Sequence, residues 1–144
     1  MTVLTSARTV QSDRDRATRL FLDWSCDPRW RAQVHRMTVE PSGHAVTGQT
    51  IVEELRFAGL TFVTPTRIEH ADATQARYRG GSAMVNVSGT RVISAVSPGE
   101  IRLTATLDIR LRGPLRPLTA LLAPSYRRLQ EADLDRLVAL LAPG

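Results

Sequence analysis

The sequence has no lysine, a single cysteine, few aromatic residues and no long apolar run, and these shortages exclude several kinds of protein. Cys26 is the only cysteine among 144 residues, so an internal disulfide bond and a multi-cysteine metal site are excluded. No run approaches the roughly 18 consecutive apolar residues of a membrane-spanning helix. Residues 1–14 also lack the apolar core of a signal peptide. We therefore expect a cytoplasmic protein without a membrane span.

Motifs of common enzyme classes are also missing. The sequence contains no G-x-G dinucleotide-binding motif and no G-x-S-x-G nucleophile elbow. Gly80-Gly81-Ser82 lies between two predicted strands and not before a helix, so it cannot bind phosphate as a P-loop does. The three histidines, His35, His44 and His70, have none of the spacings of metal sites. We expect no cofactor and no metal.

All 19 basic residues are arginine, and the net charge is +5. Arginine binds phosphate bidentately, but the 14 acidic residues are spread among the arginines, which favours an ordinary solvated surface. By strand alternation, five arginines point to the outer face of the predicted sheet: Arg67, Arg77, Arg79, Arg102 and Arg110. No aromatic residues interleave with them, as binding of single-stranded nucleic acid would favour. We expect no nucleic-acid partner, and the same face is a candidate homodimer contact.

The longest apolar periodicity lies at the C-terminal end. Leucines over Pro114–Leu141 recur at steps of three and four residues, which predicts a long amphipathic helix. A shorter stripe predicts a helix over Asp13–Asp23, and Asp27-Pro28 predicts a break followed by a second helical turn. The long helix must lie on a sheet, because each buries the apolar face of the other.

The remaining segments alternate with a period near two, which predicts strands. Their ranges are Val3–Val10, Val34–Glu40, Thr47–Phe57, Leu60–His70, Gln75–Gly80, Met84–Val96 and Ile101–Leu111. The last strand has apolar residues at every odd position, the pattern of a half-buried antiparallel strand. Gly89 predicts a β-bulge in Met84–Val96. The pattern of that strand leaves open which of its faces points inward.

The predicted fold class is therefore α+β, in a single domain over residues 1–144. The order is one strand, one or two short helices, six antiparallel strands and a long C-terminal helix. This order resembles the SRPBCC (START-like) superfamily and its helix-grip fold. The segments DPRW (27–30), RIEHAD (67–72) and ADLDRLVALL (132–141) are also similar to that superfamily, the last to its small polyketide-cyclase-like members. The resemblance implies a curved sheet of about seven strands wrapped on the C-terminal helix, with a cavity between them.

Two functions follow from this resemblance. The first is binding or carrying a hydrophobic or amphipathic small molecule, such as a lipid or polyketide, in a cavity of about 300 Å³ or more. The second is a polyketide cyclase, aromatase or dehydratase reaction in the same cavity. Such a reaction needs a carboxylate or tyrosine with a shifted pKa.

Two acidic residues are candidates for that catalytic role. Glu53 shares the strand face of Ile51 and Leu55, and Asp133 falls within the apolar arc of the terminal helix. A carboxylate facing an apolar cavity would have a raised pKa and could act as a general acid or base. The alternatives are that a bulge turns Glu53 outward, that Asp133 lies where the helix leaves the sheet, or that an arginine pairs with either carboxylate.

The predicted pocket wall is mainly aromatic and apolar, with a few polar groups that orient a ligand. The candidate ligand-binding residues are Trp30, Phe57, Phe62, Tyr78, Asn86, Leu107, Leu122 and Tyr126. For each of them, ordinary core packing is the alternative role.

Overall fold

In a computed structural model, which describes residues 3–57 and 59–142 without the side chain of Phe57, seven strands form one antiparallel sheet. The strands are β1 (Val3–Gln11), β2 (Val34–Glu40), β3 (Thr50–Phe57), β4 (Leu60–Ala71), β5 (Gln75–Gly81), β6 (Val85–Ser97) and β7 (Glu100–Leu111). Their order in the sheet is β1-β7-β6-β5-β4-β3-β2. Strands β2 to β7 are therefore consecutive neighbours, and only β1 pairs with a strand distant in sequence.

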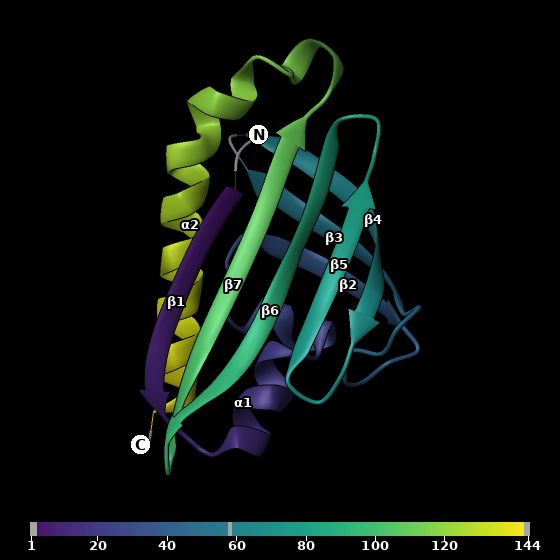
Figure 1. The fold of residues 1–144 in the computed structure, drawn as a ribbon. Coiled ribbons are helices and arrows are strands. Elements are labelled where there is room, and N and C mark those ends of the chain that lie inside the picture. Colours follow the sequence, from purple (N-terminus) through teal and green to yellow (C-terminus); the bar gives the residue numbers. More distant parts are fainter. Residues whose placement is uncertain (1–2, 58, 143–144) are drawn as a thin grey trace.

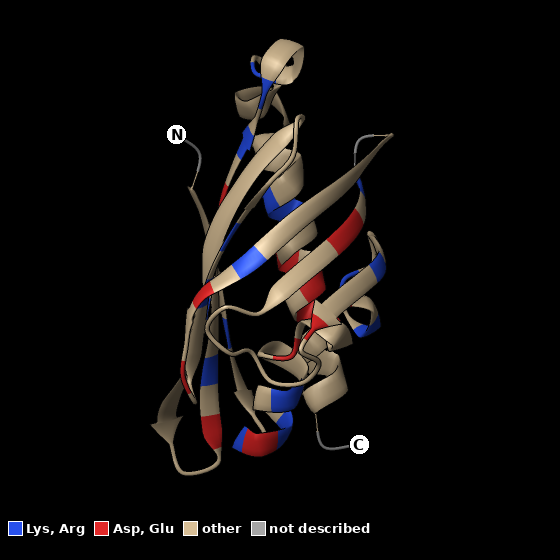
Figure 2. Ribbon diagram, turned by 90° about the vertical axis from the view of Figure 1, so that its right-hand side faces the viewer, with Lys and Arg blue, Asp and Glu red and all other residues tan. Residues whose placement is uncertain are grey.

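The sheet curves strongly, so that β1, β7 and β6 lie at a steep angle to β2, β3 and β4 (Figure 1). Its inner face carries the predicted apolar residues. In β7, for example, Ile101, Leu103 and Leu107 are buried while Arg102 and Arg110 are exposed. The five arginines expected on the outer face are all exposed. Arginine and acidic residues are interspersed along the strands and helices (Figure 2).

The structure decides the orientation of β6, which the sequence pattern leaves open. Val85, Arg91 and Ile93 are buried and therefore belong to the inner face. The bulge predicted at Gly89 is wrong, because the register is regular there and shifts only between Ala95 and Ser97. Gly89 has another role: a Cβ atom at this position would clash with the carbonyl oxygen of Thr106 and lie 2.6 Å from the Tyr78 hydroxyl oxygen, so only glycine fits between them.

Two short helices follow β1. They are α1 (Arg14–Phe21) and the 3₁₀ helix η1 (Trp24–Arg29). The side chain of Asp13 caps α1 by accepting from the Asp15 N–H at 3.2 Å, and Asp23 caps η1 by accepting from the Ser25 N–H at 3.0 Å. The predicted helix over Asp13–Asp23 is therefore too long, because Asp23 begins the next helix.

The long helix α2 (Leu118–Leu141) follows a short 3₁₀ turn, η2 (Gly113–Leu115), and lies along β1 on the inner side of the sheet (Figure 1). It begins later than predicted, because Pro114 belongs to η2 and Pro117 precedes the first helical residue. Its buried residues are Tyr126, Asp133, Leu134, Leu137 and Leu141.

The main hydrophobic core lies where α1, η1 and the C-terminal part of α2 meet the sheet. Phe21, Leu22, Trp30, Leu134 and Leu137 belong to it. A smaller cluster of Phe62, Val85 and Leu111 lies near the beginning of α2. This architecture confirms the predicted α+β class, with a curved seven-stranded sheet on a long C-terminal helix. Within the described ranges, no helix is both long and apolar enough to cross a membrane.

Candidate functional site: a cavity between the sheet and α2

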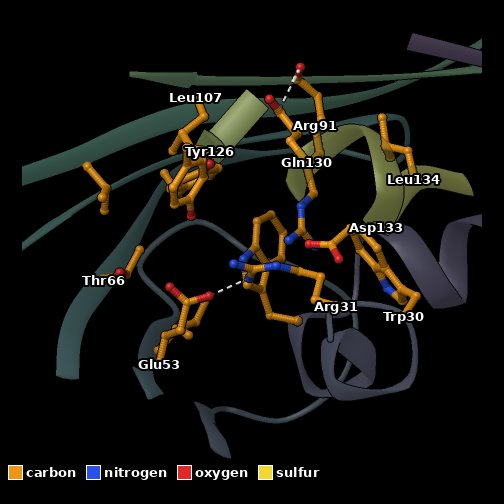
Figure 3. Close-up of a pocket in the computed structure, with 15 residues that line it drawn as sticks. Trp30, Arg31, Glu53, Thr66, Arg91, Leu107, Tyr126, Gln130, Asp133 and Leu134 are labelled. Carbon is orange, nitrogen blue, oxygen red and sulfur yellow. Dashed lines mark hydrogen bonds and ion pairs between the residues drawn. The ribbon is translucent and has the colours of Figure 1, made fainter. Parts of the chain in front are cut away.

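A cavity of about 70 Å³ lies between the inner face of the sheet and α2 (Figure 3). Four aromatic side chains line it: Trp24, Trp30, Tyr78 and Tyr126. The volume is far below the roughly 300 Å³ expected of a binding cavity, so that expectation is wrong for this conformation. A buried water needs roughly 10–15 Å³. The space therefore has room for about five water-sized groups.

Arg91 of β6 is buried and lines the cavity. Its guanidinium donates to both carboxylate oxygens of Asp27, at 2.9 and 2.6 Å, and to the carbonyl oxygen of Phe21 at 3.1 Å. The guanidinium carbon also lies 4.0 Å from the ring centroid of Trp24 and 5.0 Å from that of Trp30. Arg91 is therefore held by a bidentate ion pair and by aromatic faces.

Arg31 extends this ion-pair network to the cavity wall. Its Nη1 donates to Asp27 at 2.9 Å and to Glu53 Oε1. Burial by itself would lower the pKa of Arg31, but the carboxylates of Glu53 and Asp27 outweigh it, so the pKa is raised well above its usual value. Glu53 thus faces inward, as its strand alternation predicts, and it is paired with arginine there.

Asp133 of α2 brings a second carboxylate to the cavity. Its Oδ1 accepts from the backbone N–H of Ala32 at 3.3 Å and from the guanidinium of Arg136. Burial nevertheless raises the pKa of Asp133, although Arg31, Ala32 and Arg136 all act in the opposite direction. The direction is the one expected of a carboxylate at an apolar cavity. A catalytic role for Asp133 or Glu53 stays a prediction.

The two tyrosines of the cavity are neutral hydroxyl groups at physiological pH. Burial raises the pKa of Tyr78 to about 12, and burial also raises the pKa of Tyr126. The Tyr78 ring packs edge-on against Trp24, with 5.7 Å between the ring centroids. Both hydroxyls are therefore suited to hydrogen bonding and not to accepting a proton.

Several of the predicted site residues meet at this cavity. Trp30, Tyr78, Leu107 and Tyr126 line it together with Glu53 and Asp133. Trp30 also has a packing role, since its indole N–H donates to the carbonyl oxygen of Leu20 at 3.1 Å.

The other predicted residues lie elsewhere. Leu122 lines a second, apolar space of about 10 Å³, which shares Tyr126 with the first. Phe62 packs in the small cluster with Val85 and Leu111 and does not line the cavity. Asn86 is exposed and lines two grooves with Arg110 and Arg112 on the outside of the protein, because the odd residues of β6 face inward. The side chain of Phe57 lies outside the described residues.

Three polar residues of the cavity were missed by sequence reasoning: Arg31, Arg91 and Gln130. Arg91 shares the strand face of Val87 and Ile93, and this was the one available signal. This alternation alone does not predict a buried arginine, because arginine is almost never fully buried unless it is paired. The partner, Asp27, is far away in sequence. Among the described residues, no group of three or more His, Cys, Asp or Glu side chains could hold a metal ion.

A comparison with protein families places the chain. The model described as polyketide cyclase / dehydrase and lipid transport matches residues 1–142. The chain belongs to this family. The START-like resemblance inferred from the order of elements is thereby confirmed. No curated protein sequence matches the chain well enough to count as a relative.

Solved structures show the same fold at low sequence identity. The Zhui aromatase/cyclase from Streptomyces sp. R1128 is 15% identical with a TM-score of 0.79, and the match covers 97% of this chain and 93% of that one. A START superfamily protein from Mycobacterium smegmatis is 14% identical with a TM-score of 0.76, covering 96% of both chains. The ginseng major latex-like protein 151 from Panax ginseng is 12% identical with a TM-score of 0.73, covering 99% and 98%. At these identities the likeness concerns the fold.

Proposed function

We propose that this protein binds one small amphipathic molecule between the sheet and α2. The observation that supports this most directly is the cavity itself, in which aromatic rings surround a few polar groups, in a family described by polyketide cyclisation and lipid transport. Pockets for small molecules have this composition, with apolar walls and a few polar groups that fix the orientation.

The small volume requires that part of the protein moves when a ligand enters. Tyr126 lines both the 70 Å³ cavity and the apolar space beneath Leu122, so a displaced Tyr126 ring would join the two. The segment that precedes it in α2, residues 118–125, contains no buried residue. The ligand's polar end would then lie near Arg31 and Asp133, and its apolar end beneath Leu122.

A second candidate function is a cyclase or dehydratase reaction in the same space. The observation that favours it is Asp133, whose carboxyl group lines the cavity and has a raised pKa. Such a carboxyl group can donate a proton closer to neutral pH than an exposed one. Binding is the simpler proposal, because it requires no proton transfer.

Binding can be tested with N-phenyl-1-naphthylamine, an uncharged amphipathic molecule whose fluorescence rises in apolar surroundings. We expect a saturable increase that corresponds to one probe per protein. Ala105 lines the cavity, so Ala105→Leu should fill the space and lower the affinity about tenfold or more. Ala139→Leu adds the same atoms at an exposed position of α2 and should leave binding unchanged.

Native mass spectrometry of the purified protein, compared with the denatured protein, would identify any molecule that it retains. Equal probe binding by both alanine variants and the unmodified protein would overturn the proposed site. Absence of saturable binding would overturn the proposed function.

A further inference from the structure

One residue that lines the cavity carries a buried hydrogen-bond acceptor that has no donor. In the described part of the chain, three buried side-chain oxygens lack a hydrogen-bond partner, those of Gln49, Asp108 and Gln130. Of these three residues, only Gln130 lines the cavity between the sheet and α2. A buried polar atom without a partner is rare in folded proteins and calls for an explanation.

The orientation of the Gln130 amide follows from its neighbour. Its Nε2 donates to the carbonyl oxygen of Ala105 at 3.4 Å. The reverse orientation would place the amide oxygen against that carbonyl oxygen, and two acceptors repel each other. Gln130 therefore offers an acceptor, Oε1, and the group that satisfies it must be a donor.

Carboxylates around Gln130 also favour a donor over an acceptor or an anion. Glu53 and Asp133 line the same cavity, and each uses one oxygen for its hydrogen bonds to the protein, which leaves the other oxygen as an acceptor.

The arginines near the cavity are all paired with carboxylates. Arg91 pairs with Asp27, Arg31 with Asp27 and Glu53, and Arg136 with Asp133. Among the residues that the structure describes, no cavity-lining arginine thus remains to neutralise an incoming anion. A carboxylate or phosphate would have to enter beside two acidic side chains, which costs free energy through repulsion and desolvation.

We propose that the buried end of the ligand is an uncharged hydroxyl group that donates a hydrogen bond to Gln130 Oε1. This inference rests on the proposed binding function and narrows it to phenols and alcohols, to the exclusion of fatty acids and phosphate headgroups. Gln130 is then the residue that determines specificity. The aromatic rings of Trp30 and Tyr126 provide the surface for the body of the ligand (Figure 3).

Water is the competing explanation, because about five water-sized groups fit into 70 Å³, and a water that reached Gln130 Oε1 would satisfy it. The two explanations predict different selectivity. If water alone occupies the site, ligands with and without a hydroxyl group bind equally well. If Gln130 recognises the ligand, removal of the hydroxyl hydrogen weakens binding.

Three small probes separate these cases: 4-ethylphenol, its methyl ether 4-ethylanisole, and 4-ethylbenzoate. Near pH 7 the phenol is uncharged, since phenolic groups have a pKa of about 10, and the benzoate is ionised. Protein-observed NMR titration would give the affinities and identify the residues affected. We expect 4-ethylphenol to bind about tenfold or more tightly than either of the others, with shifts at Gln130 and Tyr126.

Variants of Gln130 assign that preference to its oxygen. Gln130→Met has a similar shape but lacks the acceptor, so 4-ethylphenol should bind only as well as 4-ethylanisole does. Gln130→Glu keeps an acceptor and should retain the preference. Leu129→Met, at the neighbouring α2 residue that does not line the cavity, is the matched control and should bind all three probes like the unmodified protein.

The outcomes distinguish this inference from the proposed function. Equal affinities for phenol, ether and benzoate, or a preference that persists in Gln130→Met, would overturn the role of Gln130 and leave binding in the cavity intact. If no probe shifts the cavity residues, both proposals are wrong.

Discussion

The two halves of α2 differ sharply, although both carry leucines at helical spacing. From Tyr126 onward, the helix contributes all of its buried residues. Leu137 in this half is 0% exposed, whereas Leu121 in the first half is 71% exposed. The same leucine-rich pattern thus places leucines in the core in the C-terminal half of α2 and leaves them exposed or half-buried in the first half.

The reason lies in what each half faces. The C-terminal half packs against the core formed with α1 and η1, whereas across the space beneath Leu122 the helix faces only Ile109 and Leu111 of β7. Pro124 lies at the boundary and cannot donate to the carbonyl oxygen four residues earlier. The packed half therefore maintains the fold, and the proposed entry of a ligand would displace the exposed half.

The largest expected effect concerns the ion pairs of the packed region. Asp27 is 0% exposed and accepts two hydrogen bonds from Arg91, so Asp27→Asn leaves a buried guanidinium without its full counter-charge. We expect a loss of about 3–5 kcal/mol in the free energy of unfolding, measured by urea denaturation. Asp135→Asn is the control, because its side chain is 65% exposed in the pair with Arg8 and should matter by less than about 1 kcal/mol. Similar losses for both variants would contradict this interpretation.

A pair of leucine variants tests the two halves directly. Leu137→Ala should cost about 2–4 kcal/mol, because it removes a fully buried side chain and leaves a cavity. Leu121→Ala should change the free energy of unfolding by less than about 0.5 kcal/mol. If the Leu121 variant were as unstable as the Leu137 variant, the first half of α2 would be packed more tightly than the structure shows.

The smallest effect is the pH dependence contributed by Asp133. Burial raises its pKa in the folded protein, so the folded state holds this proton more tightly than the unfolded state does. Asp133 therefore costs no stability below its unfolded pKa, and the cost appears as the pH rises through its folded pKa. Asn cannot ionise, so Asp133→Asn should gain stability relative to the unmodified protein between acidic and neutral pH, by less than the Leu137→Ala loss. Parallel pH–stability curves for the two proteins would contradict the raised pKa.

The class and order of elements could be predicted from the sequence, because they follow from local periodicity. The odd-numbered apolar residues of β7 lie on the inner face, as their alternation indicates. The predicted ends of the helices were less accurate. Asp23 caps the next helix, and the prolines before α2 make it begin several residues later than predicted. The bulge predicted at Gly89 was wrong because the reasons for a glycine there, the Thr106 carbonyl oxygen and the Tyr78 ring, come from the two neighbouring strands.

The candidate site was predicted only where a side chain's face followed from its own strand or helix. Glu53 and Asp133 were located by such periodicity and do line the cavity. Arg31, Arg91 and Gln130 were not found, because nothing local distinguishes a buried arginine or glutamine from an exposed one.

The sequence by itself determined an antiparallel sheet with a long helix on its apolar face, because each alternating or helical pattern is a property of neighbouring residues. Only the tertiary structure decided what fills the space between them. Asp27 meets Arg91, and Arg31 meets Glu53, across long stretches of chain. Buried charges are stable only when their partners are correctly placed. The size and polarity of the cavity therefore depend on contacts that appear only after the chain has folded.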